Sequence, residues 1–145
     1  MPYRRTIRQR ILRGGLSILA SRQLKIPRWA YEAIYPRHKR AAVPDGAWMR
    51  RLVYTTGGRS EIGVVEGENA IECLMTLVGK KPGPADCEVG TIRRDLGVHA
   101  VENIDGFDFH ARVMHRAENE EEAAHDLPIV LKLLRKRQRD RLLGT

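Results

Sequence analysis

The chain has 145 residues, 42% of them hydrophobic, and a formal net charge of +8 at pH 7. This length and composition suit one globular domain with a single core. No run of apolar residues approaches the ~20 that a membrane-spanning helix needs. The two cysteines, Cys73 and Cys87, match no metal-binding spacing and are too few for a disulfide scaffold. We therefore expect reduced thiols and no metal site.

The positive charge is concentrated at the two ends. Residues 1–40 hold eleven Lys or Arg and one acid, and residues 132–145 hold six and one, so the middle is acidic. Such ends favour contact with a polyanion or an acidic partner, although a solvated basic surface is equally compatible. The candidate contact residues are Arg4, Arg5, Arg8, Arg10, Arg135, Lys136, Arg137 and Arg139. The first thirteen residues, with five Arg and no acid, also predict a mitochondrial address.

The first half of the chain predicts three helices and two strands. Helical spacing of apolar residues indicates a helix over 4–13, which Gly14-Gly15 ends. Residues 16–20 predict a buried strand. Residues 27–35 predict a helix that begins at Pro27 and is closed by Pro36. After a loop over 36–46, a helix is predicted over 46–54 and a strand over 61–66.

In the second half, residues 68–78 predict a helix with one apolar face, and residues 79–90 are expected to be loop. Extended segments are predicted at 97–101 and 111–114, with turn chemistry and exposed aromatic residues between them. A helix from Glu118 has acidic first turns, and Pro128 is expected to kink or restart it before a basic helical end. This order of elements predicts an α+β sandwich in which helices cover a small sheet.

Six motifs in one order carry a resemblance to a known family. In chain order they are GLSILA at 15–20, the helix that ends in Tyr35, VVEGENA at 64–70, PAD at 84–86, GTIR at 90–93, and MH at 114–115 before a Glu-rich helix. Over roughly residues 5–131 the chain thereby resembles nucleoside diphosphate kinases. The resemblance implies a ferredoxin-like sandwich in which His115 carries phosphate between nucleotides. It also implies that Tyr35 and Arg93 bind the nucleotide.

Other features depart from that family. Its first strand and the Lys-Pro-Asp-Gly motif, whose Lys binds phosphate, precede the point at which this chain begins, so we expect an incomplete sheet. At five positions this chain has a different residue from the family. Met75 stands where the family has a phosphate-binding Arg, Arg112 where it has an Asn, Ala117 where it has a Ser, and Arg94 and Arg116 where it has glycines. Arg112 and Arg116 would either bind phosphate or fill the cleft. Since each lost donor costs on the order of 10²–10³ in rate, these changes predict little turnover.

The expected domains are a basic helix over 1–14, a kinase-like domain over 15–131 with an inserted loop at 102–110, and a basic helical tail over 132–145. For the retained residues, structural alternatives stand beside the functional roles. His115 would be an inherited residue in an unused site, Arg93 would pair with Asp95, and Tyr35 would be a packing residue.

The main interpretation is a non-catalytic structural or accessory subunit of a large mitochondrial assembly, such as the mitochondrial ribosome or a respiratory-chain complex. Its predicted partners are other subunits, one supplying the absent strand, and ribosomal RNA or an acidic protein surface at the basic ends. This interpretation expects no cofactor. The alternative is an active nucleoside diphosphate kinase that works through a phosphohistidine at His115 with Mg²⁺ and ATP.

Overall fold

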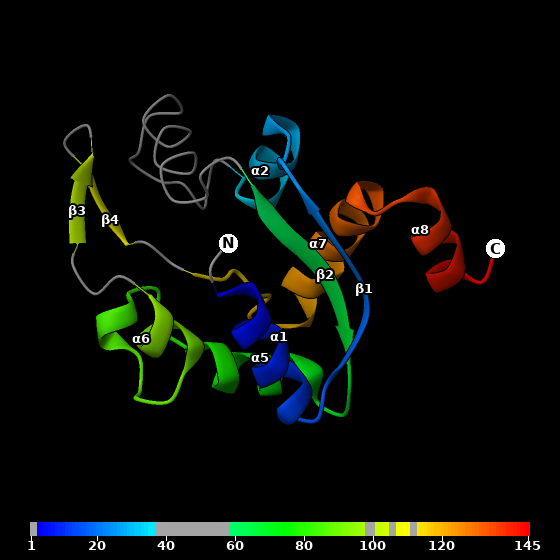
Figure 1. The fold of residues 1–145 in the computed structure, drawn as a ribbon. Coiled ribbons are helices and arrows are strands. Elements are labelled where there is room, and N and C mark those ends of the chain that lie inside the picture. The colour runs from blue at the N-terminus through cyan, green and yellow to red at the C-terminus, as the bar shows by residue number, and fades with distance from the viewer. Residues whose placement is uncertain (1–2, 37–58, 98–100, 105–106, 111–112) are drawn as a thin grey trace.

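The structure is a computed structural model that describes residues 3–36, 59–97, 101–104, 107–110 and 113–145 (Figure 1). Along the described residues the elements are α1 (Arg4–Arg13), β1 (Ser17–Leu24), α2 (Arg28–Ile34), β2 (Ser60–Glu66), α5 (Ala70–Val78), the 3₁₀ helix η1 (Pro84–Asp86), α6 (Ile92–Leu96), β3 (Val101–Ile104), β4 (Phe107–His110), α7 (Glu120–Leu133) and α8 (Lys136–Leu143). The helix predicted over 46–54 and the side chain of Arg112 lie outside the described residues.

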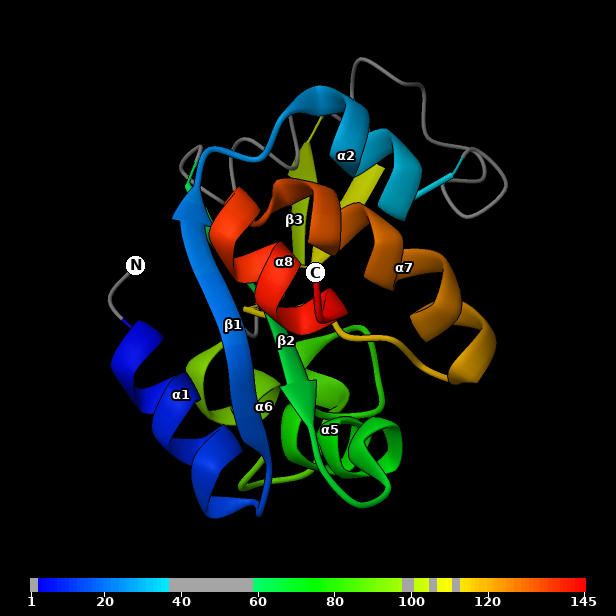
Figure 2. The same cartoon turned by 90° about the vertical axis from the view of Figure 1, so that its right-hand side faces the viewer.

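The centre of the fold is an antiparallel ribbon of β1 and β2. The two strands pair from Ser17 opposite Glu66 to Leu24 opposite Ser60, with an irregularity at Leu19 between the paired positions. Strand β1 therefore extends beyond the predicted 16–20, because its polar second half also pairs with β2. In Figure 1, α8 lies to the right of the ribbon, and α1 and α5 lie to its left. In Figure 2, α7 and α8 both lie to the right of β1, and α1 lies to its left.

Apolar side chains fill the space on both sides of the ribbon. On the α7 side, Ala20 and Ile62 from the strands form a buried cluster with Ala30, Leu133 and Leu134. On the other side the buried residues include Ile11, Leu16, Val78 and Ile92. Helices packed on both faces of a small antiparallel sheet confirm the predicted α+β sandwich.

Two predictions for the middle of the chain are wrong in detail. The expected loop over 79–90 contains η1, a single 3₁₀ turn that begins at Pro84. Residues 102–104 and 107–110 were predicted as part of a turn or inserted loop, but they lie in the strands Val101–Ile104 and Phe107–His110, which pair as an antiparallel hairpin. Of the segments predicted as extended, residues 98–100 and 111–112 lie outside the described residues, and Val113 and Met114 form no strand.

The C-terminal helices also differ from the prediction. Helix α7 begins at Glu120, where the Asn119 side chain accepts a hydrogen bond from the Glu122 amide at 2.8 Å. It continues through Pro128, and the break before α8 falls at Leu134 and Arg135. Apolar residues on both sides of that break pack against the central cluster. Tertiary packing therefore offsets the hydrogen bond that Pro128 removes from the helix.

Helix α1 is attached to the ribbon by charge. Arg4 and Arg8 both bond to the carboxylate of Glu61 on β2, Arg8 at 2.6 Å, and Arg8 also donates to Ser21 Oγ at 2.9 Å. Burial raises the pKa of Glu61, but hydrogen bonds from Ser21 and Arg4 and the charges of Arg4 and Arg8 together hold it below its ordinary value. Arg4 and Arg8, which were proposed to contact an external partner, thus pair with Glu61 within the chain.

Replacing Glu61 with Gln should lower the free energy of unfolding by about 1 kcal/mol, because solvent screens the partly exposed arginines. In wild type this contribution is present above the ordinary pKa of 4.5 and is lost as pH falls through the lower folded-state pKa. Urea unfolding at several pH values measures both effects. The control Glu32→Gln breaks the exposed Arg28–Glu32 pair on α2 and should cost at most about 0.5 kcal/mol. Equal losses for the two variants would contradict the prediction.

Candidate active site around His115

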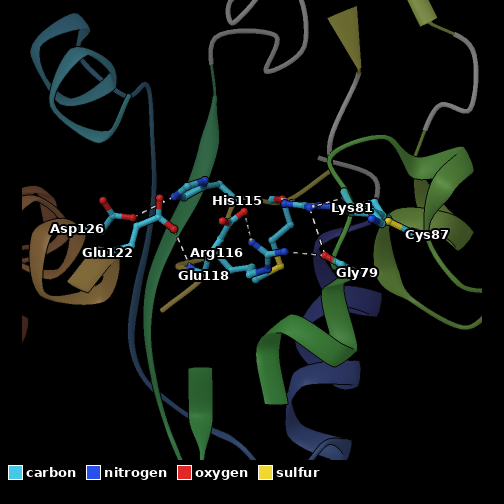
Figure 3. A network of polar contacts seen from close by, with 10 residues as sticks. Gly79, Lys81, Cys87, His115, Arg116, Glu118, Glu122 and Asp126 are labelled. Carbon is cyan, nitrogen blue, oxygen red and sulfur yellow. Dashed lines mark hydrogen bonds and ion pairs between the residues drawn. The ribbon is translucent and has the colours of Figure 1, made fainter. Parts of the chain in front are cut away.

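His115 lies in the segment that leads into α7, and a carboxylate on that helix orients it. Its Nε2 is 3.0 Å from Asp126 Oδ2, and the other oxygen of Asp126 is 2.9 Å from Nδ1 of His125 (Figure 3). Burial raises the pKa of Asp126, but the hydrogen bonds from both histidines and their charges outweigh it and hold the pKa below its ordinary value. Asp126 is therefore an anionic acceptor at neutral pH.

This contact selects one tautomer of His115. An ionised carboxylate only accepts hydrogen bonds, so a neutral His115 places its proton on Nε2 and leaves the Nδ1 lone pair available. Among the described residues Nδ1 has no hydrogen-bond partner, and the His115 side chain is 31% exposed. The arrangement orients the imidazole and leaves Nδ1 on a side chain that solvent can reach, as a nucleophilic histidine requires.

Tyr35, the residue directly after α2, lies against the same imidazole. The ring centroids of Tyr35 and His115 are 5.1 Å apart with an interplanar angle of 66°, an edge-to-face contact. Tyr35 is half-buried, and its backbone amide donates to Tyr31 O at 2.9 Å, which closes the last turn of α2. The structure thus brings Tyr35 to the site. A packing role and a nucleotide contact are both compatible with this position.

Arg93 connects the site to the segment after α5. Its buried guanidinium, 2% exposed as a residue, donates to the carbonyls of Gly79 at 3.2 Å and Lys81 at 2.8 Å, and twice to Met114, the residue before His115, at 3.0 and 3.3 Å. Charged donors make the stronger protein hydrogen bonds, so Arg93 sets the position of the His115 segment.

The structural alternative for Arg93 was an ion pair with Asp95, but Asp95 pairs with Arg10 instead. The Asp95 carboxylate accepts from Arg10 on α1 at 2.8 Å and from the Gly90 amide at 3.1 Å. Gly90 has φ of 93°, a left-handed conformation that glycine adopts without strain. Thr91 then caps α6, with its hydroxyl accepting from the Arg94 amide. The GTIR motif therefore forms a capped turn that directs Arg93 inward.

Sequence reasoning missed Asp126, and for Arg116 it left two roles open, phosphate binding or filling of the cleft. A signal for Asp126 was present, because it is the one acid of α7 beyond the first turn. Arg116, next to His115, is buried and donates to Gly79 O at 2.8 Å. The remaining basic candidates lie on α1, on α8 and at Arg135 before α8. Of these, Arg4 and Arg8 are in ion pairs with Glu61, Arg10 with Asp95, and Lys136 with Asp140. In the part of the chain described, no three metal-binding side chains gather together.

Comparison with known proteins identifies the family. A family model described as nucleoside diphosphate kinase matches residues 3–134. The chain belongs to the nucleoside diphosphate kinase family. It is 31% identical over 125 residues to the nucleoside diphosphate kinase of Methanocaldococcus jannaschii, which covers 86% of this chain and 79% of the relative. It is 32% identical over 120 residues to that of Ignicoccus hospitalis, covering 83% and 72% of the two chains.

These relatives contradict the main functional interpretation from the sequence. A further relative from Rickettsia akari, 31% identical over 79% of this chain and 71% of its own, is also named nucleoside diphosphate kinase. All three names describe kinases, and none describes a structural subunit of a mitochondrial assembly. The prediction of a non-catalytic subunit is therefore wrong on this comparison, and the kinase alternative is the better supported. The earlier inference counted lost phosphate donors without the contacts that Asp126 and Arg116 provide.

No helix among the residues that the structure describes is both long and apolar enough to cross a membrane.

Replacing Arg93 with Met should destabilise the fold by about 2–4 kcal/mol, because three carbonyl groups lose a charged donor in a buried place. The matched control is Arg94→Met on the same helix, whose side chain donates to Ala85 O near the surface. It should change stability by about 0.5 kcal/mol or less. Urea unfolding of both variants tests this, and similar costs would show that Arg93 does not hold the segments together.

Proposed function

We propose that the chain is a nucleoside diphosphate kinase that moves the terminal phosphate between nucleotides through His115. The observation that carries the proposal is the 3.0 Å contact of Nε2 with the Asp126 carboxylate, which leaves Nδ1 as the free nucleophile. Membership of the kinase family and the names of its relatives support the same reaction.

In the first half-reaction the Nδ1 lone pair attacks the γ-phosphorus of a nucleoside triphosphate. The bond from that phosphorus to the bridging oxygen breaks, and the nucleoside diphosphate leaves with the electron pair. A second nucleoside diphosphate then attacks the phosphohistidine, which restores the free imidazole. The ionised Asp126 stabilises the positive charge that the ring acquires while its Nδ1 bears the phosphoryl group.

Tyr35 and Arg93 are the proposed nucleotide-binding residues. Tyr35 borders the imidazole, and Arg93 bonds the backbone carbonyl of Met114, the residue before His115, which supports these roles. Mg²⁺ usually reaches such sites on substrate phosphates with one or two carboxylates. Glu118, 62% exposed near His115, is the residue that would take part, and the ion would supply charge neutralisation of the phosphates.

The mitochondrial address and the external contacts of the basic ends stay predictions of the sequence. The structure supports a smaller contact surface than the eight residues first suggested. Arg4, Arg8 and Arg10 on α1 have carboxylate partners within the chain. Arg5 on α1 and Arg137 on α8 are exposed and have the better access to a polyanion.

Incubation of the protein with γ-labelled ATP and Mg²⁺ should give an acid-labile, base-stable label at His115, because phosphohistidine is the expected intermediate. Initial rates with two nucleotides should follow ping-pong kinetics. The variant His115→Gln should carry no label, whereas His125→Gln, which keeps the nucleophile, should still be labelled. Stoichiometric labelling of His115→Gln would refute the assignment.

Asp126→Asn should lower kcat by on the order of 10²-fold or more, because an amide can donate to Nε2 and so favour the tautomer with its lone pair there. The rate of phosphohistidine formation in a single turnover is the measurement. Label on His115 that forms as fast as in wild type would show that Asp126 does not orient the ring.

A further inference from the structure

Arg116 is a buried arginine directly after the proposed nucleophile. Its side chain is 2% exposed, although arginine is seldom buried without a charged partner. In Figure 3 it lies between Gly79 on one side and Glu118 on the other. A residue with a long, charged side chain in such a place needs a physical reason, because burying its charge costs free energy unless the charge is paired.

The described contacts satisfy only part of this guanidinium. One Nη donates to Gly79 O at 2.8 Å, and the other is 3.5 Å from an oxygen of Glu118, whose side chain is 62% exposed. The Nε is buried and has no hydrogen-bond partner. Since a guanidinium carries five N–H donors, the group retains unused donors inside the protein. The unused donors of Arg116 are of the kind that bind an anion.

A second guanidinium lies at the same carbonyl. Arg93 donates to Gly79 O at 3.2 Å, so Arg93 and Arg116 share one neutral acceptor. Two like charges that meet in a buried place repel each other, and the neutral carbonyls of Gly79, Lys81 and Met114 that accept from them offset only part of that repulsion. An anion of two negative charges with several oxygens would compensate both groups, as phosphate does with paired arginines.

We infer that Arg116 is a phosphate-binding residue, and that with Arg93 it forms a two-arginine site for a phosphate group of the nucleotide beside His115. The inference rests on the proposed function for the identity of the ligand. The unpaired Nε and the shared Gly79 carbonyl are independent of it. The bound group is a nucleotide phosphate, for which metal-free pyrophosphate is the simplest probe.

The test is calorimetric titration of the full chain with pyrophosphate in the absence of Mg²⁺. Arg116→Gln keeps an amide that can donate to Gly79 O but removes the charge and the Nε, and it should weaken binding at least 10-fold. Arg94→Gln is the control on a neighbouring arginine and should bind as wild type does. Thermal unfolding without ligand reports whether each variant is folded. A folded Arg116→Gln protein with wild-type affinity would overturn the inference.

Glu118→Gln provides a second arm that does not depend on the stability of Arg116 variants. It removes the carboxylate that, among the described residues, competes for Arg116, so metal-free pyrophosphate should bind two- to fivefold more tightly. Unchanged or weaker binding would count against the site.

Comparison with the labelling experiment separates this inference from the proposed function. Labelling of His115 together with normal pyrophosphate binding by folded Arg116→Gln would overturn the phosphate site alone. Absence of label together with weakened binding by Arg116→Gln would support the anion site while the proposed kinase reaction fails.

Discussion

The guanidinium of Arg93 is the contact on which the arrangement of the site depends. The residues from 113 to 119 form no strand or helix, so no backbone ladder holds them. The bonds from Arg93 to Met114 O tie that segment to α6, and its bonds to Gly79 O and Lys81 O tie α6 to the end of α5. Because charged donors to buried carbonyls are strong and directional, one side chain holds three parts of the chain in place.

The imidazole then receives its orientation from two elements that are distant in sequence. Asp126 on α7 accepts from Nε2, and Tyr35 at the end of α2 borders the ring. Helix α7 packs on the ribbon through its apolar face, so the core and the contact between Asp126 and His115 share one element. A change that shifts α7 would therefore alter both stability and the position of the imidazole.

The charged groups around His115 differ from those expected when only the substituted family positions are counted. The resemblance predicted losses at Met75 and Ala117, and these implied a weak phosphate site. The structure adds a cation at Arg116, which faces the same carbonyl as Arg93, and an anion at Asp126, which holds the imidazole. Gains and losses of charge around His115 partly compensate, and an argument from individual positions does not register this compensation.

The sequence by itself determined the class of fold, the main elements and three of the site residues. Helix α1, helix α2 and strand β2 follow from apolar spacing and from glycine and proline signals, since these act between neighbours in the chain. His115, Tyr35 and Arg93 followed from motifs in a conserved order along the sequence of a known family. Their proximity could be expected only through that resemblance.

Only the tertiary structure decided the partners of these side chains. Periodicity could not show that Asp126 would reach His115, that Arg10 would take Asp95, or that Arg116 would share a carbonyl with Arg93. Nor could it show that the helix would pass through Pro128, because packing of the flanking residues on the core outweighs a local preference. Such contacts depend on distances between segments far apart in the chain, and a linear pattern does not contain those distances.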